Sequence, residues 1–429
     1  MSRILSHISG WYEVSDERSR LISMEGTRGL AVLLVFFVHF HALFNSYLAP
    51  GSPAFGASHF MGLVGNTGVD LFFVISGYLI YGAVIRRRSS YARFVRRRVE
   101  RIYPTFLAVF CLYLLLSWVF PAANKIHGSW TSEAWYILQN ILLLPGIFNV
   151  TPIITVAWSL SYEFFFYLSL PLLVLITALW RWRPQARALF FGLIGATYLV
   201  GSTFLPRAHV RLTMFVSGIL LYEALNSATF RRRLNRRGEI GAVVLFLVSL
   251  VVAYLLDTRG SWFNVIPGWT HGRSTILGVP GYQGPYKTAF LGVSCFWLTA
   301  YCFGYAGWLY RVFCWTPLRC LGNMSYSYYL IHGAALQGVA ALLHRLVSAG
   351  PRSPILYVAV LVAGFGATWI ASSALFLLVE KPVSLSRRAA RQGPAARTSA
   401  GYSYWQQQGA AESVALAPAA PEKPGGILQ

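Results

Sequence analysis

Long apolar stretches recur along the whole chain and constrain its fold more than any other feature. A helix needs about 20 mostly apolar residues to cross a bilayer, and this sequence contains about ten such stretches, separated by short polar connections. Hydrophobic residues make up 56% of the chain and charged residues only 12%, an unusual balance for a soluble domain. We therefore predict an all-α, polytopic membrane bundle of about ten transmembrane helices, at Gly29–Leu48, Val64–Ile85, Tyr103–Phe120, Thr155–Trp180, Ala188–Leu205, Val210–Ala224, Ile240–Leu256, Ala289–Tyr310, Asn323–Leu343 and Ile355–Val379.

The positive charges orient this bundle, because short cytoplasmic loops retain Lys and Arg. With ten spans and both termini cytoplasmic, only eight of the 36 Lys and Arg residues face outward. The stretch Glu133–Phe148 is interrupted by Asn and Pro, and we interpret it as an interfacial or re-entrant segment. Counting it as an eleventh span would move the basic loop Arg231–Arg237 outside. The net charge of +22 thus indicates membrane topology rather than nucleic-acid binding, and predicts a multi-pass inner-membrane protein.

The ends of the chain differ from its middle. We predict a cytoplasmic N-terminal segment at residues 1–24, a transmembrane domain at 25–386 and a disordered cytoplasmic tail at 387–429. The tail is rich in Ala, Pro, Gly and Gln, which bury too little apolar area to order a chain. The five cysteines show no C-x-x-C spacing, so neither a disulfide framework nor a metal site is predicted.

Ionisable side chains inside the predicted spans point to function, because a charge in the hydrocarbon costs at least a few kcal/mol unless it is paired or wetted. Asp70 and Glu163 are the acidic residues well within predicted spans, and His39 and His332 lie near span centres. Asp70, His39 and Glu163 come from three spans and map to the middle or outer half of the membrane. These three side chains could therefore meet.

The first span also carries Arg28, eleven residues before His39. Eleven residues place both side chains on one helix face, about 16.5 Å apart in depth. That separation resembles the distance from the phosphates of CoA to its thioester. The alternative is that Arg28 is a snorkelling topology anchor and His39 a hydrogen-bonding packing residue.

An arginine-rich run follows the second span, in the sequence RRRSSYARFVRRRVERIYP. On a helix, Arg98 and Arg101 lie three residues apart and face the same way. Their planar, multi-donor guanidinium groups suit a phosphorylated ligand. Solvation of the loop or contact with anionic lipids explains the run as a whole equally well.

These features resemble the acyltransferase 3 family of membrane acyltransferases. The resemblance lies in five blocks in the expected order over about Glu25–Pro382. The blocks are EGTRGLAVLLVFFVHF (Glu25–Phe40), GVDLFFVISGYLI (Gly68–Ile80), FVRRRVERIYP (Phe94–Pro104), AWSLSYEFFFYLSLP (Ala157–Pro171) and LGNMSYSYYLIH (Leu321–His332). The segment HVRLTMFVSGIL (His209–Leu220) is more loosely similar to the family's Arg-and-Phe-x-x-Gly segment.

The resemblance implies transfer of an acyl group, with acetyl expected, from cytoplasmic acyl-CoA to a hydroxyl of a saccharide or glycoconjugate, without a metal. It also implies a role for each matching residue. His39 would act as general base or as acyl carrier, with Glu163 or Asp70 orienting its imidazole. The implied partners are acyl-CoA, the acceptor and membrane lipids but no nucleic acid, and a homo-oligomer is left open. The expected CoA-binding residues are Arg28, Arg98 and Arg101, and the expected substrate-binding residues are Arg211, Trp158, Tyr328 and His332.

Two other functions are compatible with the pattern. A glycolipid transporter or flippase could use the intramembrane His and carboxylates as a proton relay, and a non-catalytic scaffold would tolerate loss of His39. Direct acyl-CoA binding distinguishes the enzyme from the transporter. The outward connection Asp257–Lys287, rich in Gly, Pro and aromatic residues, is the predicted acceptor loop or lid.

Overall fold

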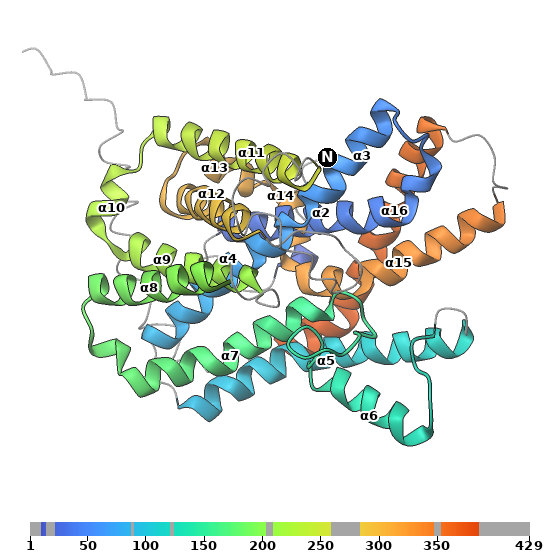
Figure 1. Cartoon of the computed structure of the whole chain (residues 1–429), viewed down its shortest axis with the longest axis horizontal. Coiled ribbons are helices and arrows are strands. Elements are labelled where there is room, and N and C mark those ends of the chain that lie inside the picture. The colour runs from blue at the N-terminus through green and yellow to red at the C-terminus, as the bar shows by residue number, and fades with distance from the viewer. Residues whose placement is uncertain are drawn as a thin grey trace, which may run out of the picture.

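The protein is helical throughout the part of the chain that its structure describes. The structure, a computed structural model, describes residues 10–13, 22–86, 90–120, 124–202, 209–258, 284–346 and 353–385. Within these ranges it contains helices and no strand, which confirms the predicted all-α class. Figure 1 shows long helices crossing one another, with α2, α4 and α14 near the middle and α5 and α7 along one side.

The helices follow the apolar stretches, with polar or Gly- and Pro-containing turns between them. The α-helices are α2 (Ile22–Phe44), α3 (Pro53–Gly65), α4 (Thr67–Arg86), α5 (Tyr91–Val119), α6 (Trp130–Ile141), α7 (Ala157–Thr177), α8 (Pro184–Ser202), α9 (Thr213–Asn226), α10 (Ala228–Arg233), α11 (Arg236–Thr258), α12 (Pro285–Gly304), α13 (Trp308–Phe313), α14 (Thr316–Asn323), α15 (Ser325–Leu346) and α16 (Pro354–Leu375). The 3-10 helices are η2 (Asn45–Tyr47), η4 (Leu179–Arg181) and η5 (Val210–Leu212), and a π-helix, η7 (Phe376–Leu385), continues α16.

Six helical segments in the described ranges are long and apolar enough to cross a membrane. They are Ile22–Tyr47, Pro53–Arg86, Tyr91–Val119, Ala157–Thr177, Arg236–Leu256 and Pro354–Leu385. The remaining predicted spans are also helical, as α8, α9, α12 and α15. The count of ten spans and the side on which the termini lie stay predictions. Helix α6 has 12 residues and extends about 18 Å, which is shorter than a bilayer core.

Two predicted spans differ from the observed helices. The second is interrupted at Asn66, where α3 ends and α4 begins. Gly68 lets α4 lie close to α2, because a Cβ there would meet the carbonyl oxygen of Ala31. Helix α12 ends at Gly304 rather than at Tyr310, because the extended backbone of Tyr305 breaks the helix.

Helix α2 lies at the centre of the bundle and packs against α3, α4, α14, α15 and α16. Its first turn touches α14 closely, since a Cβ on Gly322 would meet the backbone carbonyl of Glu25. The Glu25 carboxylate also accepts hydrogen bonds from Arg319 Nε (3.0 Å) and Asn323 Nδ2 (3.2 Å). These contacts fix the end of α2 that carries Arg28.

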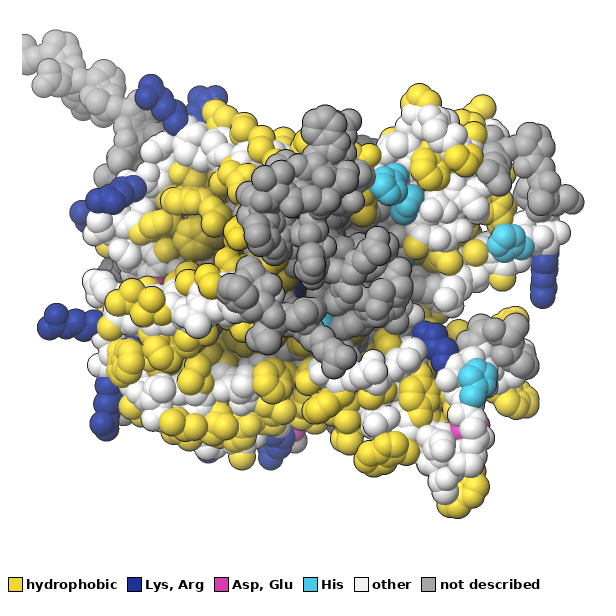
Figure 2. All heavy atoms as spheres, in the orientation of Figure 1, with side chains coloured by type: hydrophobic (Ala, Val, Ile, Leu, Met, Phe, Trp, Pro, Cys, Tyr) yellow, Lys and Arg dark blue, Asp and Glu magenta, His cyan; other side chains and the backbone are white. Residues whose placement is uncertain are grey.

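The surface is that of a protein surrounded by lipid. Large apolar side chains such as Ile176, Leu189 and Ile355 are exposed on the long helices. On the face that Figure 2 shows, hydrophobic side chains cover the flanks, and Lys and Arg gather mainly toward the end where α10 lies. The predicted tail 387–429, most of segment 1–24 and residues 259–283 of the predicted acceptor loop lie outside the described residues.

Candidate active site

Two histidines face each other across helices α2 and α15. The ring centroids of His39 and His332 are 4.7 Å apart, and their planes meet at 87°. His332 is fully buried, whereas His39 is half-buried. Both residues were expected near span centres, and the packing of α15 on α2 brings them together.

The hydrogen bonds of the two imidazoles assign their tautomers. Nδ1 of His39 lies 3.1 Å from the carbonyl oxygen of Val35, and Nδ1 of His332 lies 3.0 Å from that of Tyr328. Because a carbonyl oxygen only accepts, each Nδ1 carries the proton and each Nε2 presents a lone pair. His39 therefore has the tautomer that a general base needs, with Nε2 as the basic atom.

Glu163 lies on the side of the site where the arginines are. Its carboxylate accepts a hydrogen bond from Ser76 Oγ at 2.6 Å and another from the hydroxyl of Tyr167. The guanidinium carbon of Arg98 lies 5.2 Å from the ring centroid of Tyr167. Tyr167 thus links Glu163 to Arg98, and no hydrogen bond within the described ranges joins Glu163 to His39. An orienting role for Glu163 toward the imidazole stays a prediction.

Arg28 and Arg101 come from different helices but share a buried carboxylate. Glu380, in the π-helix η7, is 2% exposed and accepts hydrogen bonds from Ser327 N (3.1 Å) and Oγ (2.6 Å). The positive charges of Arg101 and Arg28 both act on this carboxylate. The three predicted CoA-binding arginines thus lie near two acidic side chains, Glu163 and Glu380.

Asp70 contacts Arg211 and not the histidines within the described residues. Gly68 faces α2, and a residue two positions later lies about 200° around the helix. Its carboxylate instead approaches Arg211, with 3.6 Å between Oδ1 and the arginine Nε. The Arg211 guanidinium lies over the ring of Trp158, 5.7 Å from the centroid. The structure therefore brings together Asp70, Arg211 and Trp158, and the predicted action of Asp70 on His39 has no direct contact behind it in the described part of the chain.

Two of the three tyrosines in the block Leu321–His332, Tyr328 and Tyr329, have different surroundings. Tyr328 is fully buried, and its hydroxyl lies 2.8 Å from Thr368 Oγ1, so it packs α15 against α16. The hydroxyl of Tyr329 lies 2.5 Å from Ser159 Oγ, and its ring centroid lies 6.1 Å from that of His332. The charges of Arg211 and Glu163 both act on Tyr329. Tyr329 therefore lies next to His332 and within reach of the charges of Glu163 and Arg211.

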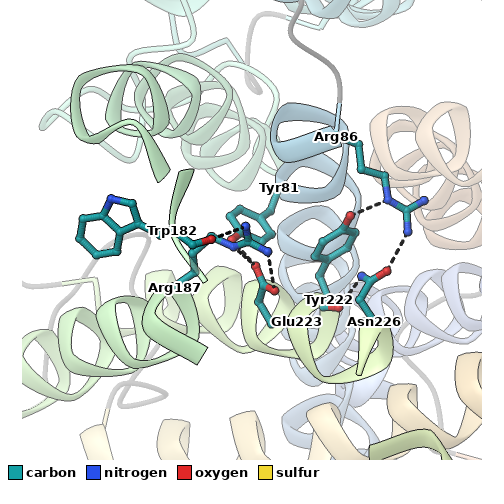
Figure 3. Close-up of polar contacts among 7 residues, drawn as sticks. All are labelled: Tyr81, Arg86, Trp182, Arg187, Tyr222, Glu223 and Asn226. Carbon is teal, nitrogen blue, oxygen red and sulfur yellow. Dashed lines mark hydrogen bonds and ion pairs between the residues drawn. The ribbon is translucent and has the colours of Figure 1, made fainter. Parts of the chain in front are cut away.

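A further polar cluster lies away from these residues, between α4, α8 and α9. Figure 3 shows Arg187 bonded to both oxygens of Glu223, at 2.6 and 3.0 Å, and Tyr81 donating to the same carboxylate. Beside it, Arg86 donates to the hydroxyl of Tyr222 at 2.6 Å. Every oxygen of Glu223 is satisfied by protein donors, so this cluster joins helices and offers no ligand position.

Two residues of the site were not singled out from the sequence. Glu380 directly follows the last predicted span. An acidic residue at the end of an apolar stretch was the sequence signal that could have identified it. Tyr329 belongs to the block Leu321–His332 and directly follows Tyr328, the tyrosine that was predicted to bind substrate. Its neighbour Ser159 is 170 positions away in the sequence, so only the folded chain reveals the contact.

Comparisons with known proteins place this site in a family. The sequence matches the acyltransferase 3 family, whose description is an acyltransferase domain, over residues 21–373, and the chain belongs to this family. O-acetyltransferase OatA of Staphylococcus aureus is 30% identical over 178 residues, which cover 38% of this chain and 26% of OatA. Acyltransferase MdmB of Streptomyces mycarofaciens is 32% identical over 158 residues, covering 36% of this chain and 39% of MdmB.

A third relative matches over more of its own length. An uncharacterized protein of Haemophilus influenzae is 32% identical over 227 residues, which cover 47% of this chain and 91% of that protein. The chain therefore spans less than half the length of OatA and of MdmB. No solved structure matches significantly. The chain is thus a member of an acyltransferase family. Six of its described helical segments are long and apolar enough to cross a membrane. Acyl transfer needs an acyl donor and an acceptor.

Proposed function

We propose that this protein is an integral inner-membrane O-acyltransferase that moves an acyl group, acetyl in the first instance, from acyl-CoA to a hydroxyl of a saccharide or glycoconjugate. The main support for the proposal is the arrangement of two side chains on α2. Arg28 and His39 share one helix face about 16.5 Å apart, and His39 meets His332 at 4.7 Å. Kinship to proteins named O-acetyltransferase and acyltransferase supports the same reaction.

In the proposed complex, Arg28, Arg98 and Arg101 bind the phosphates of CoA. Guanidinium groups donate in pairs to phosphate oxygens, which makes them better suited to this task than lysines. Arg98 is half-buried between the rings of Phe94 and Tyr167, and this packing holds it toward the bundle. The pantetheine arm then follows the face of α2 toward His39.

The reaction needs a base that removes the proton of the acceptor hydroxyl and later gives it to the CoA thiolate. Nε2 of His39 takes the proton of the acceptor hydroxyl while the oxygen attacks the thioester carbonyl carbon. The tetrahedral intermediate collapses, the carbon–sulfur bond breaks, and the CoA thiolate recovers the proton from the imidazolium. The products are an ester and CoA-SH. In a two-step alternative, Nε2 attacks the thioester itself and the hydroxyl then attacks the acyl-imidazole.

The other predicted site residues support this centre in the proposal. Glu163 is linked to Arg98 through Tyr167, and in the proposal its negative charge favours the transient imidazolium. Asp70, Arg211 and Trp158 lie toward the acceptor. His332 faces His39 from α15, and Tyr328 holds α15 against α16. We expect the cytoplasmic side to be the end that carries Arg98 and Arg101, following the charge distribution along the chain.

Mass spectrometry of envelope glycans and secreted glycosylated metabolites, from cells with and without the gene, tests the proposal. We expect one glycan or glycosylated product to lose an acyl mass when the gene is deleted, and the purified protein to bind acetyl-CoA. A transporter would instead deplete the whole glycan from the outer face, acyl groups included. Unchanged acyl masses together with no acetyl-CoA binding would contradict the acyltransferase proposal.

A further inference from the structure

Asp70 differs from the other buried acidic residues of the described chain in its hydrogen bonding. It is 1% exposed, and neither carboxylate oxygen has a hydrogen-bond partner within the described residues. Its ion-pair partner, Arg211 Nε, lies at 3.6 Å, which is beyond hydrogen-bond length. The other buried acids accept hydrogen bonds from protein groups, namely Glu25, Glu223, Glu239 and Glu380.

This difference indicates a ligand position. A buried carboxylate that serves only to join helices has its lone pairs satisfied, because leaving them unsatisfied costs about 1–3 kcal/mol or more for a charged group. Glu223 shows that pattern, with two bonds from Arg187 and one from Tyr81. Two oxygens without a donor among the described residues instead match a group that brings its own hydrogen-bond donors.

The first residues of several helices lie around Asp70. The residue lies in the first turn of α4, Trp158 is the second residue of α7, and Arg211 lies in η5, which leads into α9. Lys287, the third residue of α12, is 4% exposed, and its charge acts on Asp70. Helix α4 packs against α7, α9 and α12. Helix N-termini carry partial positive charge, so positive groups surround the Asp70 side chain.

Hydroxyl groups fit this site in either protonation state of Asp70. A carboxylate accepts from hydroxyls, and a protonated carboxyl both donates and accepts, which a hydroxyl can also do. The indole of Trp158 adds a flat apolar surface beside these polar atoms, and Arg211 covers part of it. Apolar and aromatic walls with a few fixed polar groups are the usual lining of a small-molecule site.

We propose that Asp70, Arg211 and Trp158 form the subsite that binds the acceptor, a saccharide whose neighbouring hydroxyls bond to the Asp70 carboxyl group. The inference rests on the proposed acyl transfer to a saccharide. The subsite adjoins the reaction centre through Tyr329, on which the charge of Arg211 acts and whose ring centroid lies 6.1 Å from that of His332. Asp70 thus positions the acceptor and leaves proton transfer to His39.

Steady-state kinetics of the purified full-length protein in lipid nanodiscs tests the subsite. The acceptor probe is the total glycan extract of cells that lack the gene, and the donor is radiolabelled acetyl-CoA. We expect Asp70→Asn to raise the apparent KM for the extract about tenfold or more and to leave the KM for acetyl-CoA within about twofold. Loss of the negative charge beside Arg211 should also lower its melting temperature, so the deciding result is the difference between the two KM changes.

Two further variants keep the outcome clear. Glu239→Gln is the matched control, because Glu239 is equally buried but accepts from the backbone N–H of Leu309 at 2.7 Å. It should lower the melting temperature and leave the KM for the extract unchanged. Trp158→Leu, which removes the flat surface and keeps the carboxylate, should raise that KM as Asp70→Asn does.

The result that overturns the subsite is wild-type transfer with an unchanged extract KM in both Asp70→Asn and Trp158→Leu. A fall in melting temperature with equal shifts of both KM values would make Asp70 a structural residue and also overturn it. Wild-type protein that transfers no acetyl group at all would contradict the proposed function itself. The two failures are therefore distinguishable.

Discussion

At the scale of single residues, the account depends on whether the arginines bind phosphate or only hold a loop in the cytoplasm. Arg98 and Arg101 are half-buried, whereas Arg96 is exposed and paired with Glu100 at 3.3 Å. Lys preserves the charge, and hence the topology, but lacks the planar pair of donors. This difference separates a ligand contact from a topology signal.

We predict that Arg98→Lys and Arg101→Lys insert normally and raise the KM for acetyl-CoA. Losing one bidentate, charge-assisted contact should cost about 1.5–3 kcal/mol, roughly ten- to a hundredfold in affinity. Arg96→Lys is the control and should match wild type. If acetyl-CoA kinetics are the same in all three variants and in wild type, the CoA phosphates bind elsewhere.

Residue spacing predicted part of this site and could not predict the rest. Arg28 and His39 could be related from the sequence because they lie on one helix, whose geometry is known in advance. Glu380 could not be related to Arg101, because the action of one charge on the other depends on how η7 packs against α5. The partner that anchors Glu380, Ser327, is 53 positions away. Local periodicity contains no information on such contacts.

At the scale of helices, a buried ion pair fastens α8 to α9. The side chains of Arg187 and Glu223 are 13% and 4% exposed, and two hydrogen bonds join them. We predict that Glu223→Gln markedly lowers the melting temperature of the purified protein, since removing one partner of a buried pair costs about 3–5 kcal/mol. Thermal unfolding followed by intrinsic fluorescence would measure it.

The exposed pair Arg96–Glu100 provides the matched control for this prediction. Its side chains are 67% and 44% exposed, and such pairs contribute about 0–1 kcal/mol. Glu100→Gln should therefore leave the melting temperature nearly unchanged. Equal effects of Glu223→Gln and Glu100→Gln would show that the Arg187–Glu223 pair does not fasten the helices.

The close packing of α14 on α2 gives a second prediction about helices. A Cβ at position 322 would meet the carbonyl oxygen of Glu25, and that backbone cannot rotate away as a side chain could. We predict that Gly322→Ala destabilises the protein by about 1–3 kcal/mol, as overpacking usually does. Gly338, also in a helix, has nothing within 4 Å of a Cβ, so Gly338→Ala should be neutral or stabilising. Comparing the two melting temperatures checks this, and equal values would contradict it.

The sequence specified where most helices lie but not which way they face. In a membrane, lipid and protein interior are both apolar, so the pattern of apolar residues does not separate the lipid face from the packed face. Asp70 illustrates the consequence. Its depth suggested that it could meet His39, whereas its face on α4 directs it to Arg211. The break at Asn66 had a local signal that the prediction passed over, because Gly65, Asn66, Thr67 and Gly68 form a run of residues that interrupt helices.

At the scale of the whole molecule, hydropathy and five motif blocks identified the class correctly. The family match over residues 21–373 confirms the acyltransferase assignment, and the described chain is helical as predicted. Six of the predicted spans correspond to helical segments that are long and apolar enough to cross a membrane. Helices α12 and α15 contain more polar residues and bury several of them within the bundle, so hydropathy distinguishes these helices less well.

The central claim is that His39 performs acyl transfer from acyl-CoA and is not needed to bind it. The most direct measurement is transfer of radiolabel from acetyl-CoA to the glycan extract of gene-deleted cells, by purified wild-type and His39→Ala proteins, alongside acetyl-CoA affinity by calorimetry. The account predicts that His39→Ala loses transfer by about a hundredfold or more and binds acetyl-CoA within about threefold of wild type. A His39→Ala protein that transfers the label at near wild-type rate would contradict it.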